Sequence, residues 1–443
     1  MSEFKYIIFF IVIFAGIPIG YMLAKKYPRI ENLLWFLLLF FTARTEDINF
    51  ISMQTYRGTS KGFEIGLVDI TAVILFFIIY NRREKYPLTL PMGSYLYFIY
   101  FAFSALSIIN SDIYVYSFFE LWKMIRMYFY FFVIYNLIRS FKDIEQFLKY
   151  MAIIVFFITM IVLKQKYLEG MFQTMGPFPH QNSLVMYLIV YGSLFLSYLL
   201  NSKKANIYLW VTAFGACAVD ILSTLSRGGM ALFSLSIFII FLLSYAHKFS
   251  LRKLGIAGLF LILGSAVLYK ASDTIMERIR TAPQESVNVR LVLAEAAQNM
   301  ANDKILGIGL NNFALKINPP YKYGNHIERL NEDEKGGLVE TIYLMIAAET
   351  GWLNLGIFII MLLFFYFLNV KNYIKLKHGK WRKYRYLTIA LIGALTSIYL
   401  QSSLEWVLKQ TNNYYQLMFI FAVIAAMRRI INERLSNENS NSK

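Results

Sequence analysis

The sequence predicts an all-α fold, a polytopic transmembrane helical bundle, and three observations support this prediction. First, 58% of the 443 residues are hydrophobic and only 16% are charged, unlike the composition of a soluble globular domain. Second, apolar segments with few charges recur along the chain, and most approach the roughly 20 residues that an α-helix needs to cross the hydrocarbon layer. Third, these segments do not alternate apolar and polar residues with period two, which excludes the strands of a membrane barrel.

About twelve or thirteen segments of this kind are expected to be helices. They cover residues 5–24, 31–42, 63–80, 91–109, 118–138, 150–163, 182–200, 206–225, 229–246, 254–270, 340–368, 386–406 and 413–427. The segment 31–42 is short, so it is either a crossing or a re-entrant or tilted partner. We predict one membrane domain with four parts in chain order. These are N-terminal transmembrane helices (1–270), a long extracytoplasmic loop (271–338), C-terminal transmembrane helices (339–430) and a disordered cytoplasmic tail (431–443).

The net charge of +17 is unevenly distributed among the connectors. Lys and Arg concentrate in alternate connectors, namely 25–29, 82–85, 139–149, 203–204, 248–253, 371–385 and the residues after 427. This alternation is the positive-inside pattern, which predicts that these connectors are cytoplasmic, the N-terminus is outside and the C-terminus is inside. The basic residues therefore face membrane lipids and the cytoplasm, and the pattern argues against nucleic acid as a partner. The N-terminal segment has no clear cleavage site and is expected to be a retained helix.

The single cysteine, Cys217, lies within an apolar segment. It excludes a disulfide within the chain and a cysteine metal site, and it is expected to serve packing. No clustered set of His, Asp and Glu with metal-ligand spacing is apparent, so we predict no metal and no cofactor.

The long loop contains one amphipathic helix. Its apolar positions follow the i, i+3, i+4, i+7 spacing of a helical face: Val289, Val292, Leu293, Ala296 and Met300. Ser286 is expected to cap its start, and Arg290 is expected to point away from the apolar face. The following residues, with Gly307 and Gly309, predict a turn that returns the chain towards the same membrane face.

Arg227 is the first of the polar residues that are predicted to lie at the membrane face opposite the basic connectors. It ends the segment TLSRGG and is followed by Gly228 and Gly229, which let the backbone approach a bulky ligand closely. A planar guanidinium donates the paired hydrogen bonds that a phosphate or diphosphate accepts. The alternative is an interfacial arginine that reaches the lipid headgroups.

Arg290 is a second candidate for an anion, although by itself it fits a charged residue on a surface helix. His180 and Asn182, in GPFPHQN, immediately precede a membrane helix. Asn182 either caps that helix or contacts a ligand. His180 either orients a sugar or is a solvated loop residue.

Glu340 stands at the outer end of the helix that closes the long loop, and Tyr343 follows within the first turn. A carboxylate at a helix start is favoured electrostatically, and it is also placed to accept a proton from an attacking hydroxyl. Within the apolar segment 118–138, Glu120, Lys123 and Arg126 are expected to form an internal ion pair or to serve function.

Five motifs, taken in order, resemble those of the O-antigen ligase and polymerase superfamily of bacterial membrane glycosyltransferases. They are GLVDI (66–70), GPFPHQN (176–182), TLSRGG (224–229), VRLVLAEAAQNMANDKILGIGLNNF (289–313) and ETIYLMIAAETGWLNLG (340–356). The resemblance implies a multi-pass protein of the bacterial inner membrane whose active site faces the periplasm or exterior. It also implies a donor glycan linked to undecaprenyl diphosphate, no metal, and Arg227 and Arg290 as ligands of the donor diphosphate.

One motif departs from the family pattern. The last motif of the ligases opens with His-Asn, whereas Glu340 and Thr341 stand in that place here. A carboxylate can still accept the proton of the acceptor hydroxyl. The departure favours a polysaccharide polymerase over a ligase that acts on lipid A core. His180, Asn182, Arg126, His326 and Tyr343 are expected to support substrate binding.

The acceptor implied by the resemblance is a glycan or a lipid, and other proteins of polysaccharide export are possible partners. The rival prediction from another functional class is a flippase or transporter of lipid-linked sugars. Such transporters commonly have paired repeats and charged residues near the midplane of several helices. Here most polar candidates gather at one membrane face, which favours an enzyme.

Overall fold

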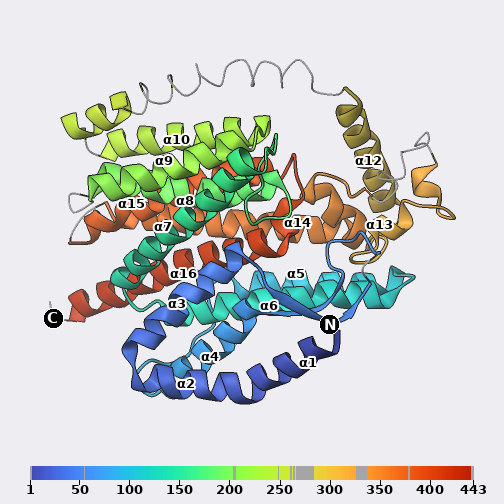
Figure 1. Cartoon of the computed structure of the whole chain (residues 1–443), viewed down its shortest axis with the longest axis horizontal. Coiled ribbons are helices and arrows are strands. Elements are labelled where there is room, and N and C mark those ends of the chain that lie inside the picture. Colours follow the sequence, from blue (N-terminus) through green and yellow to red (C-terminus); the bar gives the residue numbers. More distant parts are fainter. Residues whose placement is uncertain are drawn as a thin grey trace. The chain divides into compact units, whose positions relative to one another are not determined.

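A computed structural model describes residues 2–440 of the chain, except residues 54, 203–205, 248, 260–261, 263–264, 266–283, 326–336 and 378–379. Helices dominate this part of the chain (Figure 1). Before the long loop they are α1 (Ser2–Ile11), α2 (Ile17–Lys26), α3 (Pro28–Ala43), α4 (Leu67–Asn81), α5 (Ser94–Leu106), α6 (Tyr114–Leu137), α7 (Phe141–Leu163), α8 (Gln181–Asn201), α9 (Ile207–Ser223) and α10 (Arg227–His247), and residues 251–259 are also helical. After it come α12 (Gln284–Asp303), α13 (Phe313–Lys316), α14 (Ile342–Lys375), α15 (Arg385–Gln401) and α16 (Thr411–Ser440).

The all-α fold class predicted from the apolar runs is confirmed. Six helices in the described part are long and apolar enough to cross a membrane: Tyr6–Lys26, Phe141–Leu168, Gln181–Asn201, Arg227–His247, Ile342–Lys375 and Thr411–Glu433. Shorter apolar helices cover Leu67–Asn81, Ser94–Asn110 and Ile207–Ser223. The chain is therefore a multi-pass membrane protein. The larger number of crossings, and the side that each connector faces, stay predictions.

The main departure from the all-α prediction is a two-stranded antiparallel hairpin. Strands β1 (Asp47–Ser52) and β2 (Gly62–Gly66) pair so that Asp47 lies opposite Gly66. The start of the expected helix 63–80 is therefore wrong, because residues 63–66 belong to β2. Helix α4 begins only at Leu67, where Asp69 accepts a hydrogen bond from the Gly66 backbone N–H at 2.8 Å and caps the helix. Hydropathy alone could not separate the short strand β2, with its apolar Phe63 and Ile65, from the apolar helix that continues it.

Other helix boundaries also differ from those expected. Helix α12 begins at Gln284, so Ser286 lies within it and is not its cap. Its predicted apolar face is confirmed, since Leu293, Ala296 and Met300 are buried while Arg290 is exposed. At the C-terminus α16 continues to Ser440, so residues 431–440 of the expected disordered tail are helical.

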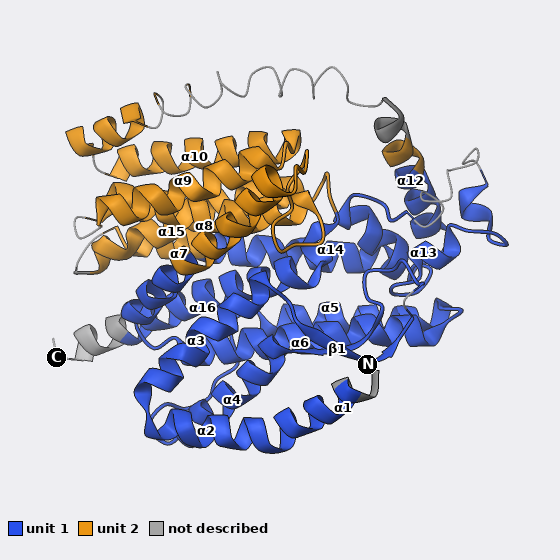
Figure 2. Ribbon diagram, viewed as in Figure 1, with its two compact units in different colours: residues 1–151, 293–368, 406–443 blue, residues 152–292, 369–405 orange. Residues whose placement is uncertain are grey.

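The described chain falls into two compact units (Figure 2). Unit 1 comprises residues 1–151, 293–368 and 406–443, and unit 2 comprises residues 152–292 and 369–405. Each unit thus combines segments from both sides of the long loop. The predicted division in chain order does not coincide with these units, and it stays a prediction.

Unit 2 is organised around α8. This helix packs against α9, α10 and α15, and nearly all of its residues are buried. A helix that is apolar all round belongs in the centre of a bundle, and α8 takes that place within its unit. The N-terminal end of α8 carries His180 and Asn182. These two candidate site residues are therefore held by a buried helix.

Unit 1 contains a break in the long helix α14. Gly351 has φ 88° and ψ 161°, a conformation outside the helical region that glycine adopts most readily. A Cβ at this position would lie 2.0 Å from the Ile305 carbonyl oxygen, so only glycine permits the turn after α12 to approach. The backbone N–H groups of Ile308 and Gly309 donate to the Ala348 and Glu349 carbonyls at 2.9 and 3.0 Å. The predicted turn at Gly307 and Gly309 therefore satisfies the backbone that the break exposes.

Candidate functional site

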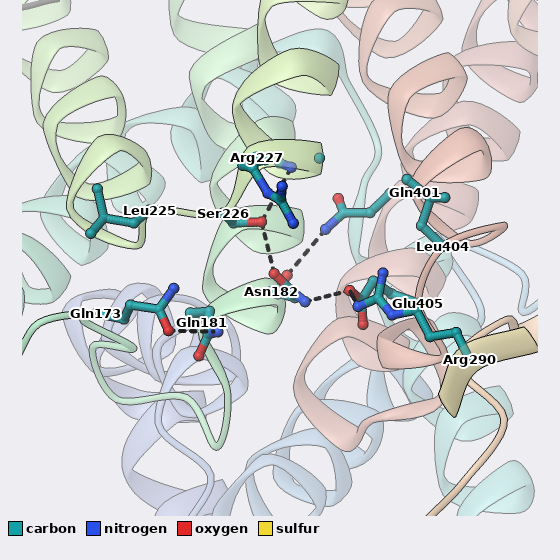
Figure 3. Close-up of a pocket in the computed structure, with 12 residues that line it drawn as sticks. Gln173, Gln181, Asn182, Leu225, Ser226, Arg227, Arg290, Gln401, Leu404 and Glu405 are labelled. Atoms are coloured by element: carbon teal, nitrogen blue, oxygen red, sulfur yellow. Dashed lines mark hydrogen bonds and ion pairs between the residues drawn. The ribbon is translucent and has the colours of Figure 1, made fainter. Parts of the chain in front are cut away.

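A polar cavity of about 140 Å³ lies within unit 2 (Figure 3). It brings together the N-terminal end of α8, the turn before α10, the end of α15 and Arg290 of α12. Its lining residues are Gln173, Gln181, Asn182, Leu225, Ser226, Arg227, Gly228, Gly229, Arg290, Gln401, Leu404 and Glu405. Three of the predicted site residues, Asn182, Arg227 and Arg290, thus line one cavity.

Asn182 connects the elements that form the cavity. Its side-chain oxygen accepts a hydrogen bond from Ser226 Oγ at 2.8 Å, and its side-chain nitrogen donates to Glu405 Oε1. Its backbone oxygen accepts from Gln401 Nε2 at 3.3 Å. Figure 3 shows these bonds converging on Asn182 from two sides. Because both ends of its amide are engaged, Asn182 fixes the relative placement of the turn before α10 and the end of α15.

The cap of α8 is His180, not Asn182. His180 Nδ1 accepts a hydrogen bond from the Asn182 backbone N–H at 3.2 Å, so the interpretation of Asn182 as the cap is wrong. This bond requires an imidazole whose Nδ1 carries no proton. Burial lowers the pKa of the half-buried His180 imidazole, and the positive charge of Arg290 lowers it further. The neutral form that caps the helix is thereby favoured.

Arg227 is presented by a constrained turn. Leu225 has a φ of 51°, in the left-handed region that branched side chains rarely adopt, and such strain is typical of functional sites. Gly229 is buried against α8, where a Cβ would lie 2.5 Å from Val185 Cγ1. Its backbone N–H donates to Ser226 Oγ at 3.2 Å. The turn therefore holds the first residue of α10, Arg227, at the cavity.

The two arginines of the cavity differ in their partners. The exposed Arg227 guanidinium makes no hydrogen bond or ion pair within the described residues. Arg290 forms an ion pair with Glu405 at 3.3 Å, between a half-exposed guanidinium and a carboxylate that is only 12% exposed. A cavity with two arginines and one carboxylate carries a net positive charge. It is therefore suited to an anion with several oxygen acceptors.

Sequence reasoning missed Glu405, which completes the cavity. The segment 386–406 was interpreted only as a membrane helix, although α15 already ends at Gln401. A signal was present, because Glu405 is the single charged residue in that segment. Carboxylates within apolar segments are costly unless they have a partner or a function.

The other predicted residues of the chain lie in unit 1 or outside the described residues. Glu340 is half-buried and precedes α14 by two residues, and the Tyr343 ring lies 6.5 Å from that of Phe358. Neither residue lines the cavity described above. His326 lies outside the described residues. The predicted roles of Glu340, Tyr343 and His326 stay predictions.

Arg126 is engaged in a buried ionic cluster of unit 1. Its Nε donates to Asp69 Oδ2 at 2.8 Å, and its Nη1 lies 3.4 Å from Glu64 Oε2. Tyr415 bridges the cluster, since its hydroxyl donates to Asp69 Oδ1 at 2.6 Å and accepts from Arg126 Nη2 at 3.2 Å. These contacts support a structural role for Arg126.

A second buried cluster of unit 1 contains the predicted ion pair. Glu120 Oε2 lies 2.8 Å from Lys123 Nζ, which confirms an ion pair within segment 118–138. Lys409 Nζ lies 3.7 Å from Glu120 Oε1 and 3.1 Å from Glu349 Oε2. All four side chains are at least 94% buried. Two carboxylates thus balance two ammonium groups, as burial of charge requires.

Comparison with known families relates this geometry to function. Residues 211–359 match the family model described as O-antigen ligase. The matched region contains Arg227, Arg290 and Glu340, whereas Asn182 and Glu405 lie outside it. No curated protein sequence matches the chain. The family match confirms, over residues 211–359, the resemblance predicted from the motifs.

Proposed function

We propose that this protein is a membrane glycosyltransferase that transfers or polymerises an oligosaccharide carried on undecaprenyl diphosphate. The observation that carries the proposal is the cavity of unit 2, which Arg227 and Arg290 both line within the region that matches the O-antigen ligase family. The exposed Arg227 guanidinium has no partner among the residues that the structure describes. Two guanidinium groups suit a diphosphate, which offers several oxygen acceptors. The charge distribution of the connectors supports an extracytoplasmic site. The family resemblance implies that the membrane is the inner membrane of a bacterium.

In the proposed reaction the acceptor hydroxyl attacks the anomeric carbon of the donor sugar. The bond between that carbon and the diphosphate oxygen breaks, and its electron pair leaves with the lipid diphosphate. Arg227 and Arg290 would stabilise the charge that develops on the leaving diphosphate. Glu340 is the proposed acceptor of the hydroxyl proton. The diphosphate linkage supplies the free energy, so the proposal needs no nucleotide or metal.

The proposed function is tested with purified full-length protein and a polyprenyl-diphosphate-linked oligosaccharide in detergent. Conversion of donor into a longer or conjugated glycan is the expected result, and it also separates an enzyme from a transporter, which needs a sealed membrane. Arg227→Ala and Arg290→Ala are each expected to lower kcat about 100-fold or more, the usual effect of removing one donor from a developing oxyanion. Full activity in both variants would contradict the proposed diphosphate site.

The proton acceptor is tested separately. Glu340→Gln is expected to abolish turnover while donor binding persists, because the amide keeps the size of the side chain but loses its basicity. The matched control is Glu349→Gln, which changes a buried, ion-paired carboxylate of α14, the helix that follows Glu340. Glu349→Gln is expected to lower the stability of the protein, because it removes a buried ion pair. Normal turnover by Glu340→Gln would show that another group accepts the proton.

We infer polymerase activity from the presence of Glu340 where ligases have His. Mass analysis of the cell-surface glycan from a deletion strain tests this inference. A single repeat unit on the lipid carrier is the expected outcome. Long chains that remain on the carrier would instead identify a ligase.

A further inference from the structure

Glu405 places a negative charge inside a cavity that otherwise suits an anion. Its carboxylate accepts a hydrogen bond from the side-chain nitrogen of Asn182 and lies 3.3 Å from Arg290 Nη2. Figure 3 shows Glu405 beside Arg290, on the side of the cavity opposite Gln173. Here one of the two arginines, Arg227, is left without a protein partner in the described residues.

The pairing of Arg290 has a direct consequence for an incoming diphosphate. The planar guanidinium binds an oxyanion best through two parallel N–H donors, and Glu405 Oε1 accepts a hydrogen bond from one of its nitrogens, Nη2, at 3.3 Å. A diphosphate that binds Arg290 must therefore displace Glu405 or share the guanidinium with it. At the same time the carboxylate repels the bound anion, since both are negatively charged and line the same cavity.

Such competition matters most after sugar transfer. In the donor, both phosphates are esterified, whereas the released lipid diphosphate has a free terminal phosphate. The second ionisation of a phosphate monoester has a pKa of about 6, so the product carries more negative charge than the donor near neutral pH. Two arginines alone would therefore hold the product more tightly than the donor. If the Glu405 carboxylate pairs with Arg290 again, the binding of the product is weakened.

We propose that Glu405 is a displaceable counter-ion of Arg290 that competes with the diphosphate and so promotes release of the lipid diphosphate. This inference rests on the proposed function of the cavity. Glu405 is a positioning residue in this role, because it acts on the substrate through Arg290 and Asn182. In the empty site Glu405 keeps the Arg290 and Asn182 side chains in place. When a diphosphate binds, Arg290 pairs with the diphosphate instead of with Glu405.

Binding of farnesyl diphosphate to the purified full-length protein tests the inference directly. This probe has a free terminal phosphate, as the lipid product does. Glu405→Gln keeps an oxygen that accepts the Asn182 hydrogen bond but removes the charge, so it is expected to tighten binding about tenfold, one unit in the logarithm of Kd. A residue that only supported the cavity would give weaker binding when changed. Unchanged or weaker binding by folded Glu405→Gln overturns the inference.

Two further variants separate this outcome from failure of the proposed function. Glu169→Gln removes the same charge from an exposed ion pair with Lys164 in unit 2 and is expected to leave binding unchanged. Arg227→Gln is expected to weaken binding about tenfold. If Arg227→Gln has no effect, the diphosphate site itself is wrong. If it weakens binding but Glu405→Gln does not tighten it, only the counter-ion role fails.

A double variant keeps the test decisive if Glu405→Gln does not fold. Arg290→Gln leaves the Glu405 carboxylate facing the probe, whereas Arg290→Gln with Glu405→Gln removes that repulsion. The double variant is expected to bind farnesyl diphosphate several times more tightly than Arg290→Gln, and equal binding overturns the inference. In the transfer assay, Glu405→Gln is expected to lower KM and kcat together, with a normal first turnover followed by slow product release.

Discussion

The cavity of unit 2 and the buried clusters of unit 1 use the same residue types in opposite ways. In unit 1, Arg126 is about 95% buried and contacts two carboxylates and a tyrosine. In unit 2, Arg227 is exposed and has no protein partner in the described residues. Buried charge is tolerated when opposite charges and hydrogen bonds surround it, whereas an exposed guanidinium beside a cavity keeps its donors available. A structural arginine therefore differs from a binding arginine in whether its guanidinium is already paired, more than in its charge.

The difference between Arg126 and Arg227 is tested most strongly by the same substitution at both positions. Arg126→Met would leave Asp69 and Glu64 without their guanidinium, and it is expected to lower the free energy of unfolding by about 3–5 kcal/mol. Arg227→Met is expected to change it by no more than about 0.5 kcal/mol. Denaturant or thermal unfolding of both proteins in the same detergent measures the difference. Equal losses of stability would remove the distinction between the two sites.

A smaller effect is expected from the packing that supports Arg227. The Cβ of Gly229→Ala would come within 2.5 Å of Val185 Cγ1, so α8 and α10 would have to separate slightly. Overpacking of this kind costs about 1–3 kcal/mol and would also displace Arg227. We therefore expect a lower melting temperature together with a raised KM for the donor. Gly215→Ala is the control, since a Cβ there meets nothing within 4 Å. Equal behaviour of both variants would argue against the packing role of Gly229.

The smallest effect concerns the pH dependence of the cap of α8. The pKa of His180 in the folded protein lies below the unfolded value of about 6.5, because burial and Arg290 disfavour the charged form. The unfolded chain therefore binds the proton more readily. The contribution of the neutral cap is present above the unfolded pKa and is lost as the pH falls through the folded pKa. Wild type is expected to lose stability on acidification below about pH 6.5.

His180→Asn tests this assignment, because asparagine is a favourable cap that does not titrate. The variant is expected to match wild type at neutral pH and to lose less stability on acidification. Unfolding curves across this pH range provide the measurement. If the stability of the variant falls as steeply as that of wild type, a group other than His180 binds the proton that lowers stability.

Much of the fold could be predicted from the sequence because membrane helices are encoded locally. The apolar run that became α8 was located to within a residue at each end, since every residue of such a helix must be compatible with burial. The hairpin of β1 and β2 was missed because Phe63 and Ile65 of the short strand β2 lead directly into the apolar residues of α4. The break at Gly351 was also missed, since its cause is the approach of Ile305 from an earlier part of the chain.

The membrane class, the family resemblance and the candidates Arg227, Arg290 and Asn182 could each be predicted from a short stretch of chain. Which charges pair with one another became known only from the packing of the helices. Asn182 and Glu405 are 223 residues apart, and Arg126 pairs with Asp69, 57 residues away, rather than with a carboxylate of its own helix. The physical reason is that residue type and hydropathy are local properties, whereas the partner of a charge depends on which helices pack together.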